Sequence, residues 1–160
     1  MGPPDPGVPA NGTGGRGDPP AQFRPVEVVD LTVELPSQFP LVSLRETDRP
    51  HRILVIPIGL PEGVALAHAR GRVATPRPLT HELMASVLGR FSIDVVALRL
   101  VGRQAGTYLA ELLLSGSRGR ETVACRASDG LILTQRLTVP APVLVDVRLI
   151  ESEGDVVPAG

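Results

Sequence analysis

The sequence predicts a single α+β domain in which a mostly antiparallel sheet packs with about three helices. Its 160 residues, 42% of them hydrophobic, can bury one core but supply too little material for two ordinary domains. Segments rich in Val, Ile and Leu come first and are bounded by Pro, Asp and Gly, which is typical of β-strands. Helical patterns and further strand-like segments follow, as in the α+β class.

Three strand-like segments open the predicted domain. They cover residues 26–34, 41–45 and 52–58. A helix is predicted next, over residues 61–70, because Pro61 suits the first helical position and Gly71 can end the helix. Since this helix has little polar surface, we expect it to be buried.

The second predicted helix has the clearest signals in the sequence. Thr80 can cap its N-terminus, and Leu79 just before the cap can pack on Met84 as a hydrophobic staple. Apolar residues then recur at helical spacing on one face, which predicts an amphipathic helix. They are Leu83, Met84, Val87, Leu88 and Phe91.

Three more strands and a third helix complete the pattern. The strands are predicted over residues 92–101, 106–114 and 120–126, as an antiparallel meander with glycine-containing turns. Both faces of the middle strand are fairly apolar, so we expect both to be covered. The third helix can start at Ser128 and must stop before Pro140. A last strand is predicted over residues 143–150.

The ends of the chain differ in composition from its middle. Residues 1–24 are rich in Pro and Gly and are predicted to form a disordered tail. The domain is expected over residues 25–150, and residues 151–160 are expected to form a flexible acidic tail. No apolar run is long enough to cross a bilayer and no signal peptide is evident, so we expect a cytoplasmic protein without membrane contact.

The composition excludes several chemistries. All 16 basic residues are arginine, which excludes phosphate-loop, Schiff-base and kinase-type lysines. The net charge of −1 gives no long-range attraction for a polyanion, so any nucleic-acid site has to be a local arginine patch. Aromatic residues make up 2% of the chain, too few to stack single strands tightly. The single cysteine, Cys125, excludes an intrachain disulfide and fits a reducing compartment.

Three acids, Glu62, Glu82 and Asp129, fall in the first turn of a predicted helix. Interaction with the helix dipole, worth roughly 0.3 to 1 kcal/mol, is sufficient to explain each of them. If the three helix starts converge, the carboxylates can instead hold Mg²⁺ or Mn²⁺, which prefer oxygen ligands. Such a metal would polarise a phosphodiester and activate a bound water.

Other polar residues at these helix starts have two interpretations each. His81 has a pKa suited to a general base or acid, or it is an inert hydrogen-bonded residue. Arg77 and Arg126 can grip phosphate oxygens, or they can pair with Glu82 and Asp129 to hold the loops.

Thr80 and Ser128 lie beside these residues, at the starts of the second and third predicted helices, where they can contact substrate. We interpret both as helix caps rather than nucleophiles, because no Ser-His-Asp arrangement is indicated by the sequence.

Two short segments of the sequence resemble the motifs of a known family. Residues 76–83 read Pro-Arg-Pro-Leu-Thr-His-Glu-Leu, and residues 126–130 read Arg-Ala-Ser-Asp-Gly. Together with residues 52–59 and Glu62, in this order and spacing, they resemble the bifunctional nuclease domain, a family associated with cleavage of RNA and DNA. The resemblance spans about residues 26–150 and implies the fold of that family.

The sequence departs from the family pattern at several places. The tryptophan usual in the segment at residues 54–59 is absent, and the usual Glu-Ala is Glu62-Gly63. Ala124 stands where the family usually has Asp, and Gly130 stands where it usually has Ala.

The resemblance implies a metal-dependent nuclease that hydrolyses RNA or DNA with little sequence specificity. In it a divalent metal, Mg²⁺ or Mn²⁺, would be bound by the acids Glu62, Glu82 and Asp129. His81 would transfer the proton. Arg77 and Arg126 would hold the phosphate.

Two other functions stay open at this point. One is a non-catalytic binding or regulatory module that keeps the nuclease-like fold, which the missing Asp and Trp, the near-neutral charge and the few aromatics favour. The other is a small-molecule anion pocket at the two arginine-bearing helix starts. A homodimer is also left open, because the sheet is apolar on both faces.

Overall fold

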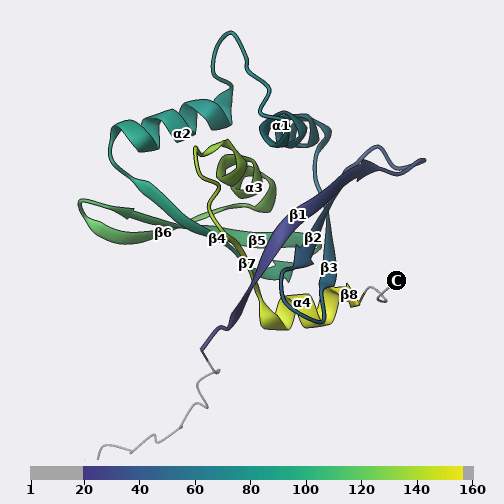
Figure 1. The fold of residues 1–160 in the computed structure, drawn as a ribbon. Helices are drawn as coiled ribbons and strands as arrows, with labels where there is room; N and C mark the ends of the chain where they lie inside the picture. Colours follow the sequence, from purple (N-terminus) through teal and green to yellow (C-terminus); the bar gives the residue numbers. More distant parts are fainter. Residues whose placement is uncertain (1–19, 157–160) are drawn as a thin grey trace, which may run out of the picture.

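The computed structural model describes residues 20–156, which form one eight-stranded sheet and four helices (Figure 1). In chain order the elements are β1 (Phe23–Val33), β2 (Pro40–Glu46), β3 (Arg52–Pro57), α1 (Leu60–Arg70), α2 (Thr80–Arg90), β4 (Asp94–Gln104), β5 (Thr107–Gly116), β6 (Gly119–Arg126), α3 (Ala127–Arg136), β7 (Val143–Asp146), α4 (Val147–Glu153) and β8 (Asp155–Val156). The predicted α+β class is confirmed, with one helix more than the three expected.

Strand β7 joins two antiparallel meanders into a single sheet. The strand order is β6-β5-β4-β7-β1-β2-β3-β8, so β4, β5 and β6 form one meander and β1, β2 and β3 form the other. β7 pairs antiparallel with β1 and parallel with β4, where Val143 lies opposite Leu98. The predicted meander of the three later strands is therefore confirmed.

Three helices gather at one end of the molecule, and α4 lies at the opposite end (Figure 1). α3 lies between α1 and α2 and is the most buried helix, with Leu131, Ile132 and Leu133 almost completely removed from solvent. From the other end, α4 adds Leu149 and Ile150 to the same hydrophobic core. One core therefore holds both ends of the domain together.

Two glycines allow helices to approach the sheet closely. A Cβ atom on Gly63 of α1 would overlap the ring of Pro40 on β2, and one on Gly130 of α3 would overlap Leu98 on β4. Pro40 and Leu98 are both buried, so neither has much room to move aside. This close packing is the physical reason that glycine suits both positions.

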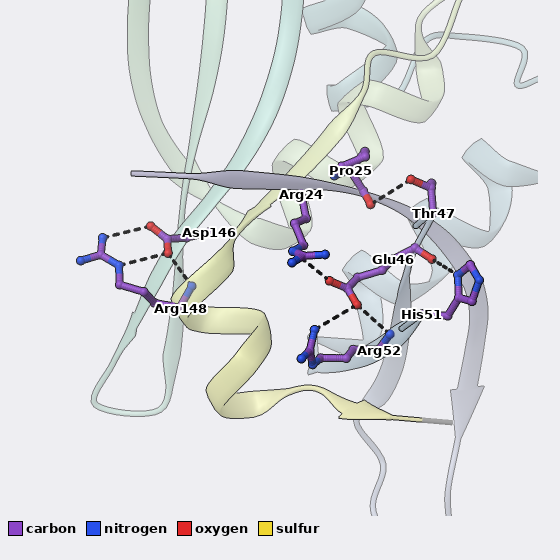
Figure 2. A network of polar contacts seen from close by, with 8 residues as sticks. All are labelled: Arg24, Pro25, Glu46, Thr47, His51, Arg52, Asp146 and Arg148. Atoms are coloured by element: carbon purple, nitrogen blue, oxygen red, sulfur yellow. Dashed lines mark hydrogen bonds and ion pairs between the residues drawn. The ribbon is translucent and has the colours of Figure 1, made fainter. Parts of the chain in front are cut away.

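A buried carboxylate ties the first meander together (Figure 2). Glu46, at the end of β2, is fully buried and accepts the backbone N–H of Arg52 on β3 at 2.9 Å. The guanidinium groups of Arg24 on β1 and of Arg52 each lie 3.5 Å from its oxygens. Because an unpaired buried charge is strongly unfavourable, this carboxylate requires all three strands to stay in place.

Helix α1 is less buried than predicted. It begins one residue early, so Pro61 is its second residue, and it ends at Gly71 as expected. Its buried residues are Gly63, Leu66 and Ala69. Val64 is half exposed, so one face of α1 packs against α3 and the sheet while the other faces solvent.

Helix α2 exposes the apolar face that its sequence pattern defines. Its N-cap is Leu79 and Thr80 is the first helical residue, so the predicted hydroxyl cap is wrong, and Leu79 occupies the cap position rather than the position before it. No residue of α2 is buried, and only Ala85 and Leu88 pack against the core. The large apolar residues that remain substantially exposed are Leu83, Met84, Val87 and Phe91.

The end of the domain differs from the prediction. The strand expected over residues 143–150 stops at Asp146, whose carboxylate accepts the backbone N–H of Arg148 and caps α4 (Figure 2). Residues 151–153, expected in a flexible tail, complete α4, and residues 155–156 pair with β3. A capping aspartate thus turns the chain out of the sheet and into a helix.

The start of the domain also differs from the prediction. Phe23 and Arg24, expected in the disordered tail, belong to β1. The rest of that tail, residues 1–19, lies outside the described part of the chain, as do residues 157–160.

The two faces of β5 are less alike than expected. On the side of α3, Tyr108, Ala110 and Leu112 are buried. On the other side, Glu111 pairs with Arg99 at 2.6 Å and Leu109 is substantially exposed. The expectation that both faces are covered is therefore wrong for this strand.

Replacing Gly63 by alanine is expected to destabilise the fold by about 1 to 3 kcal/mol, because the new methyl group overlaps the rigid ring of Pro40. The matched control is Gly89→Ala in α2, where a Cβ atom meets nothing within 4 Å. This control should instead gain roughly 0.5 to 1 kcal/mol from helix propensity. Urea unfolding of both variants measures the difference, and equal effects would contradict the close packing of α1.

Candidate active site

The guanidinium group of Arg126 lies at the centre of the candidate site. Arg126 ends β6 and is the N-cap residue of α3. Its Nε and Nη2 donate to the two carboxylate oxygens of Asp129 at 2.7 and 2.9 Å, and its Nη1 lies 3.0 Å from Oε1 of Glu62. One side chain therefore joins the first turn of α1 to the first turn of α3.

His81 extends this cluster to the third helix start. It is the second residue of α2, it is mostly buried, and its Nε2 lies 3.1 Å from Oδ1 of Asp129. When Nε2–H donates to the carboxylate, the lone pair of the neutral ring is on Nδ1, which can then accept a proton. The expected convergence of Glu62, His81 and Asp129 is thus present in the structure.

The charges of the cluster stabilise one another. The hydrogen bonds from Arg126, followed by the one from His81, lower the pKa of Asp129 below its usual value. The same bonds to Asp129 raise the pKa of Arg126. Asp129 is therefore ionised and Arg126 is cationic at neutral pH.

Arg126 keeps the capacity to bind an anion although it is paired. A guanidinium has five N–H donors, and three of them go to Asp129 and Glu62. Two donors remain on a side chain that is 64% exposed. The acids hold the plane of the guanidinium while its free N–H groups stay accessible, which is the geometry that binds phosphate oxygens.

A pocket of about 260 Å³ opens beside this guanidinium. Glu62 and Arg126 form its charged wall, and Ser128 lies at the start of α3 on the same side. Tyr108 and Gly106 also line the pocket, and neither was predicted from the sequence as a site residue. Gly106 has φ +81°, a backbone conformation that favours glycine. A glycine in a tight turn is therefore the one sequence feature that marks this part of the pocket.

Glu82 does not join the cluster. Its carboxylate accepts the backbone N–H of Leu79 and the hydroxyl of Thr75, both at 2.8 Å, and pairs with Arg136 at 2.9 Å. The bond from Leu79, more than that from Thr75, lowers the pKa of Glu82. Glu82 therefore fastens the loop before α2 to the end of α3, and the interpretation of Arg77 as its partner is wrong.

The other predicted site residues, Arg77, Thr80 and Ser128, do not make the ion-pair or capping contacts that were considered for them. Arg77 is exposed in the loop before α2 and pairs with no acid among residues 20–156. Thr80 is exposed, whereas Ser128 is buried as the second residue of α3. Neither hydroxyl caps its helix, so the interpretation of both as N-caps is wrong.

The donor set does not fit the expected divalent metal. Within residues 20–156, no three His, Cys, Asp or Glu side chains gather closely enough to hold an ion. The two acids that do converge, Glu62 and Asp129, already share the cation Arg126. Ala124 is exposed two residues before Arg126 on the same side of β6, so the aspartate usual there would have added a third carboxylate on this side.

Fold and site together define a nuclease-like α+β domain, and the comparisons agree. The sequence pattern of the bifunctional nuclease domain matches residues 42–157. The chain belongs to this family. It is also 32% identical over 133 residues to two proteins of Mycobacterium tuberculosis, "Uncharacterized protein MT1877" of strain CDC 1551 / Oshkosh and "Uncharacterized protein Rv1829" of strain ATCC 25618 / H37Rv. Each match covers 83% of this chain and 77% of the relative.

None of the helices in the described part of the chain combines the length and the apolar character needed to span a membrane.

Replacing Glu82 by glutamine is expected to lower the free energy of unfolding by about 1 to 2 kcal/mol at pH 7, because Arg136 is mostly buried and loses its ionic partner. The pKa of Glu82 is lowered in the folded state, so the difference should persist above about pH 5 and vanish as the pH falls through that pKa. Chemical denaturation across this pH range measures it.

Glu121→Gln is the matched control for this substitution. Glu121 pairs only loosely, at 3.9 Å, with the almost fully exposed Arg118. Its replacement should change stability by less than about 0.5 kcal/mol. A loss as large as that of Glu82→Gln would contradict the assigned role of Glu82.

Proposed function

We propose that this domain is a nuclease that binds a phosphodiester of RNA or DNA at Arg126 and cleaves it with His81 as the proton-transfer group. The proposal is carried by one observation: Arg126 is fixed by two acids and still presents two N–H donors beside a pocket. Membership of the bifunctional nuclease domain family supports it.

In the proposed reaction, a water molecule attacks phosphorus and gives a proton to Nδ1 of His81 as the new P–O bond forms. The bond to the leaving oxygen breaks, and the imidazolium returns the proton to that oxygen. Asp129 orients the ring through Nε2 and stabilises the imidazolium, as a carboxylate does in other histidine pairs. Arg126 stabilises the charge that develops on the phosphoryl oxygens.

Glu62 and Arg77 have supporting roles in this proposal. Glu62 is a positioning residue, because it holds Nη1 of Arg126 rather than the substrate. Arg77 is exposed and can contact a neighbouring phosphate of the same strand. Contacts to the phosphate backbone of a nucleic acid carry no sequence information, so little sequence preference is expected. The proposed compartment is the cytoplasm. No step is assigned to a divalent metal, since the donor set does not fit one.

A second candidate function is a non-catalytic module that binds an anionic ligand at the same place. It is favoured by the internal pairing of Arg126, which satisfies both acids of the cluster without any ligand. It is also favoured by Ala124, where the family usually has a carboxylate. In this case Arg126 would bind phosphate and His81 would transfer no proton.

His81→Ala should lower the rate of cleavage of labelled RNA or single-stranded DNA about 100-fold or more, since it removes the proton-transfer group. Arg126→Gln should lower cleavage and binding together. Arg118→Gln is the matched control, because Arg118 is almost fully exposed, precedes the start of β6 and pairs with Glu121 rather than with the cluster. This variant should leave both cleavage and binding unchanged. Assays with Mg²⁺, Mn²⁺ or chelator measure the metal requirement in parallel.

The outcomes separate the two candidates. Binding without cleavage under every metal condition, with binding lost in Arg126→Gln, would establish the module. Full cleavage by His81→Ala would contradict the assigned proton transfer. Cleavage that disappears with chelator would contradict the proposed reaction without a divalent metal.

A further inference from the structure

One long segment of the chain carries positive charge and no acid. Between Glu62 in α1 and Glu82 in α2 there is no Asp or Glu, whereas Arg70, Arg72 and Arg77 lie within this segment. The whole chain has a net charge of −1, so these arginines concentrate positive charge in one region. Since a near-neutral protein can bind a polyanion only through such a local patch, this segment is the candidate for contact with one.

Two of these arginines are exposed in the loop that joins α1 to α2. The loop, residues 71–79, projects beyond both helices at the top of Figure 1, and we call it the arginine loop. Arg72 and Arg77 are exposed in it, and neither pairs with an acid in the described part of the chain. Arg70, at the end of α1, instead donates to the backbone carbonyls of Val28 and Val29 on β1. The guanidinium groups of Arg72 and Arg77 are therefore available to a ligand.

Glu82 and Arg136 hold the arginine loop in place. Arg136 donates to the backbone carbonyl of Val73 at 3.2 Å and pairs with Glu82 at 2.9 Å. The hydroxyl of Thr75 donates to the Glu82 carboxylate at 2.8 Å. The two exposed arginines therefore lie on either side of an anchored segment. Because an anchored loop loses less entropy when it binds a ligand, this arrangement favours binding.

The arginine loop lies next to the candidate site. Glu82, which anchors the loop, follows His81, whose Nε2 lies 3.1 Å from Oδ1 of Asp129. Arg77 is four residues before His81, so the backbone between them spans at most about 14 Å. Stacked nucleotides advance roughly 3.4 Å each along a strand. A strand bound at Arg126 therefore has several phosphates within reach of the loop.

We propose that the arginine loop binds the phosphates next to the one held by Arg126, with Arg72 and Arg77 each holding one of them. This inference rests on the proposed nuclease function, because phosphate binding at Arg126 determines where the strand lies. Residues 63–81 contain no Phe, Tyr or Trp, so bases have no such side chain to stack on there. The loop therefore contacts the phosphate backbone and holds a strand by its charge, whatever its sequence.

The salt dependence of binding tests this inference. A labelled single strand of about 16 deoxynucleotides is titrated with the full chain by fluorescence anisotropy at several salt concentrations. Its phosphorothioate linkages keep the charge of each phosphate and resist cleavage. Each phosphate contact contributes about 0.7 to the slope of log K against log salt for a single strand. Arg72→Gln and Arg77→Gln should therefore each lower the magnitude of this slope by about 0.7, and the double variant should bind roughly 25-fold more weakly at about 0.1 M salt.

Arg90→Gln is the matched control for the loop variants. Arg90 is exposed and pairs with no acid among residues 20–156, but it ends α2, about 15 Å along the helix from Thr80. The slope of this variant should equal that of the wild-type chain. In cleavage assays the loop variants should raise KM and leave kcat unchanged, because the loop does not contact the phosphate held by Arg126.

The results distinguish this inference from the proposed nuclease function. If Arg126→Gln lowers the slope while Arg72→Gln and Arg77→Gln do not, the strand bypasses the loop and the inference is overturned. An equal loss of slope in Arg90→Gln overturns it as well, since the effect would then come from the overall charge. If the loop variants lower the slope but the wild-type chain cleaves nothing, the role of the loop is supported and only the assigned catalysis fails.

Discussion

The convergence of three helix N-termini is the constraint on which the rest of this domain depends. Each helix start carries partial positive charge on its unpaired N–H groups, and Arg126 adds a full positive charge at the same place. Such an arrangement requires negative charge to be stable, and Glu62 and Asp129 provide it. These two acids balance the charge at the helix starts and also hold the guanidinium group of Arg126, and Asp129 holds the imidazole of His81 as well.

Close packing of the helices on the sheet sets the distances within this cluster. The absence of a Cβ atom on Gly63 allows α1 to rest on Pro40, and Gly130 does the same for α3 against Leu98. These glycines lie next to Glu62 and Asp129 in the sequence. A methyl group at either position would push its helix away from the sheet and move the neighbouring acid with it. The packing of the core and the geometry of the site are therefore coupled.

The sequence predicts the strands, the first three helices and the members of the cluster, because these depend on local patterns and on a family resemblance. The ion pair between Glu82 and Arg136 could not be predicted, since Arg136 is distant in the sequence. The same limit applies to α2. Its apolar spacing indicates an amphipathic helix, but only the arrangement of α3 and the sheet shows that this row faces outward. The final helix was missed because Asp146 caps it inside an apolar segment.

Strand β7 has a consequence for how the protein is made. The two meanders touch through this strand, which lies between β4 and β1 although it is almost the last strand to be synthesised. A nascent chain on the ribosome can form each meander as it emerges, yet it cannot unite them until residue 146 has left the exit tunnel. Completion of the single sheet is therefore a late event in synthesis, and a chain interrupted before β7 would leave two separate half-sheets.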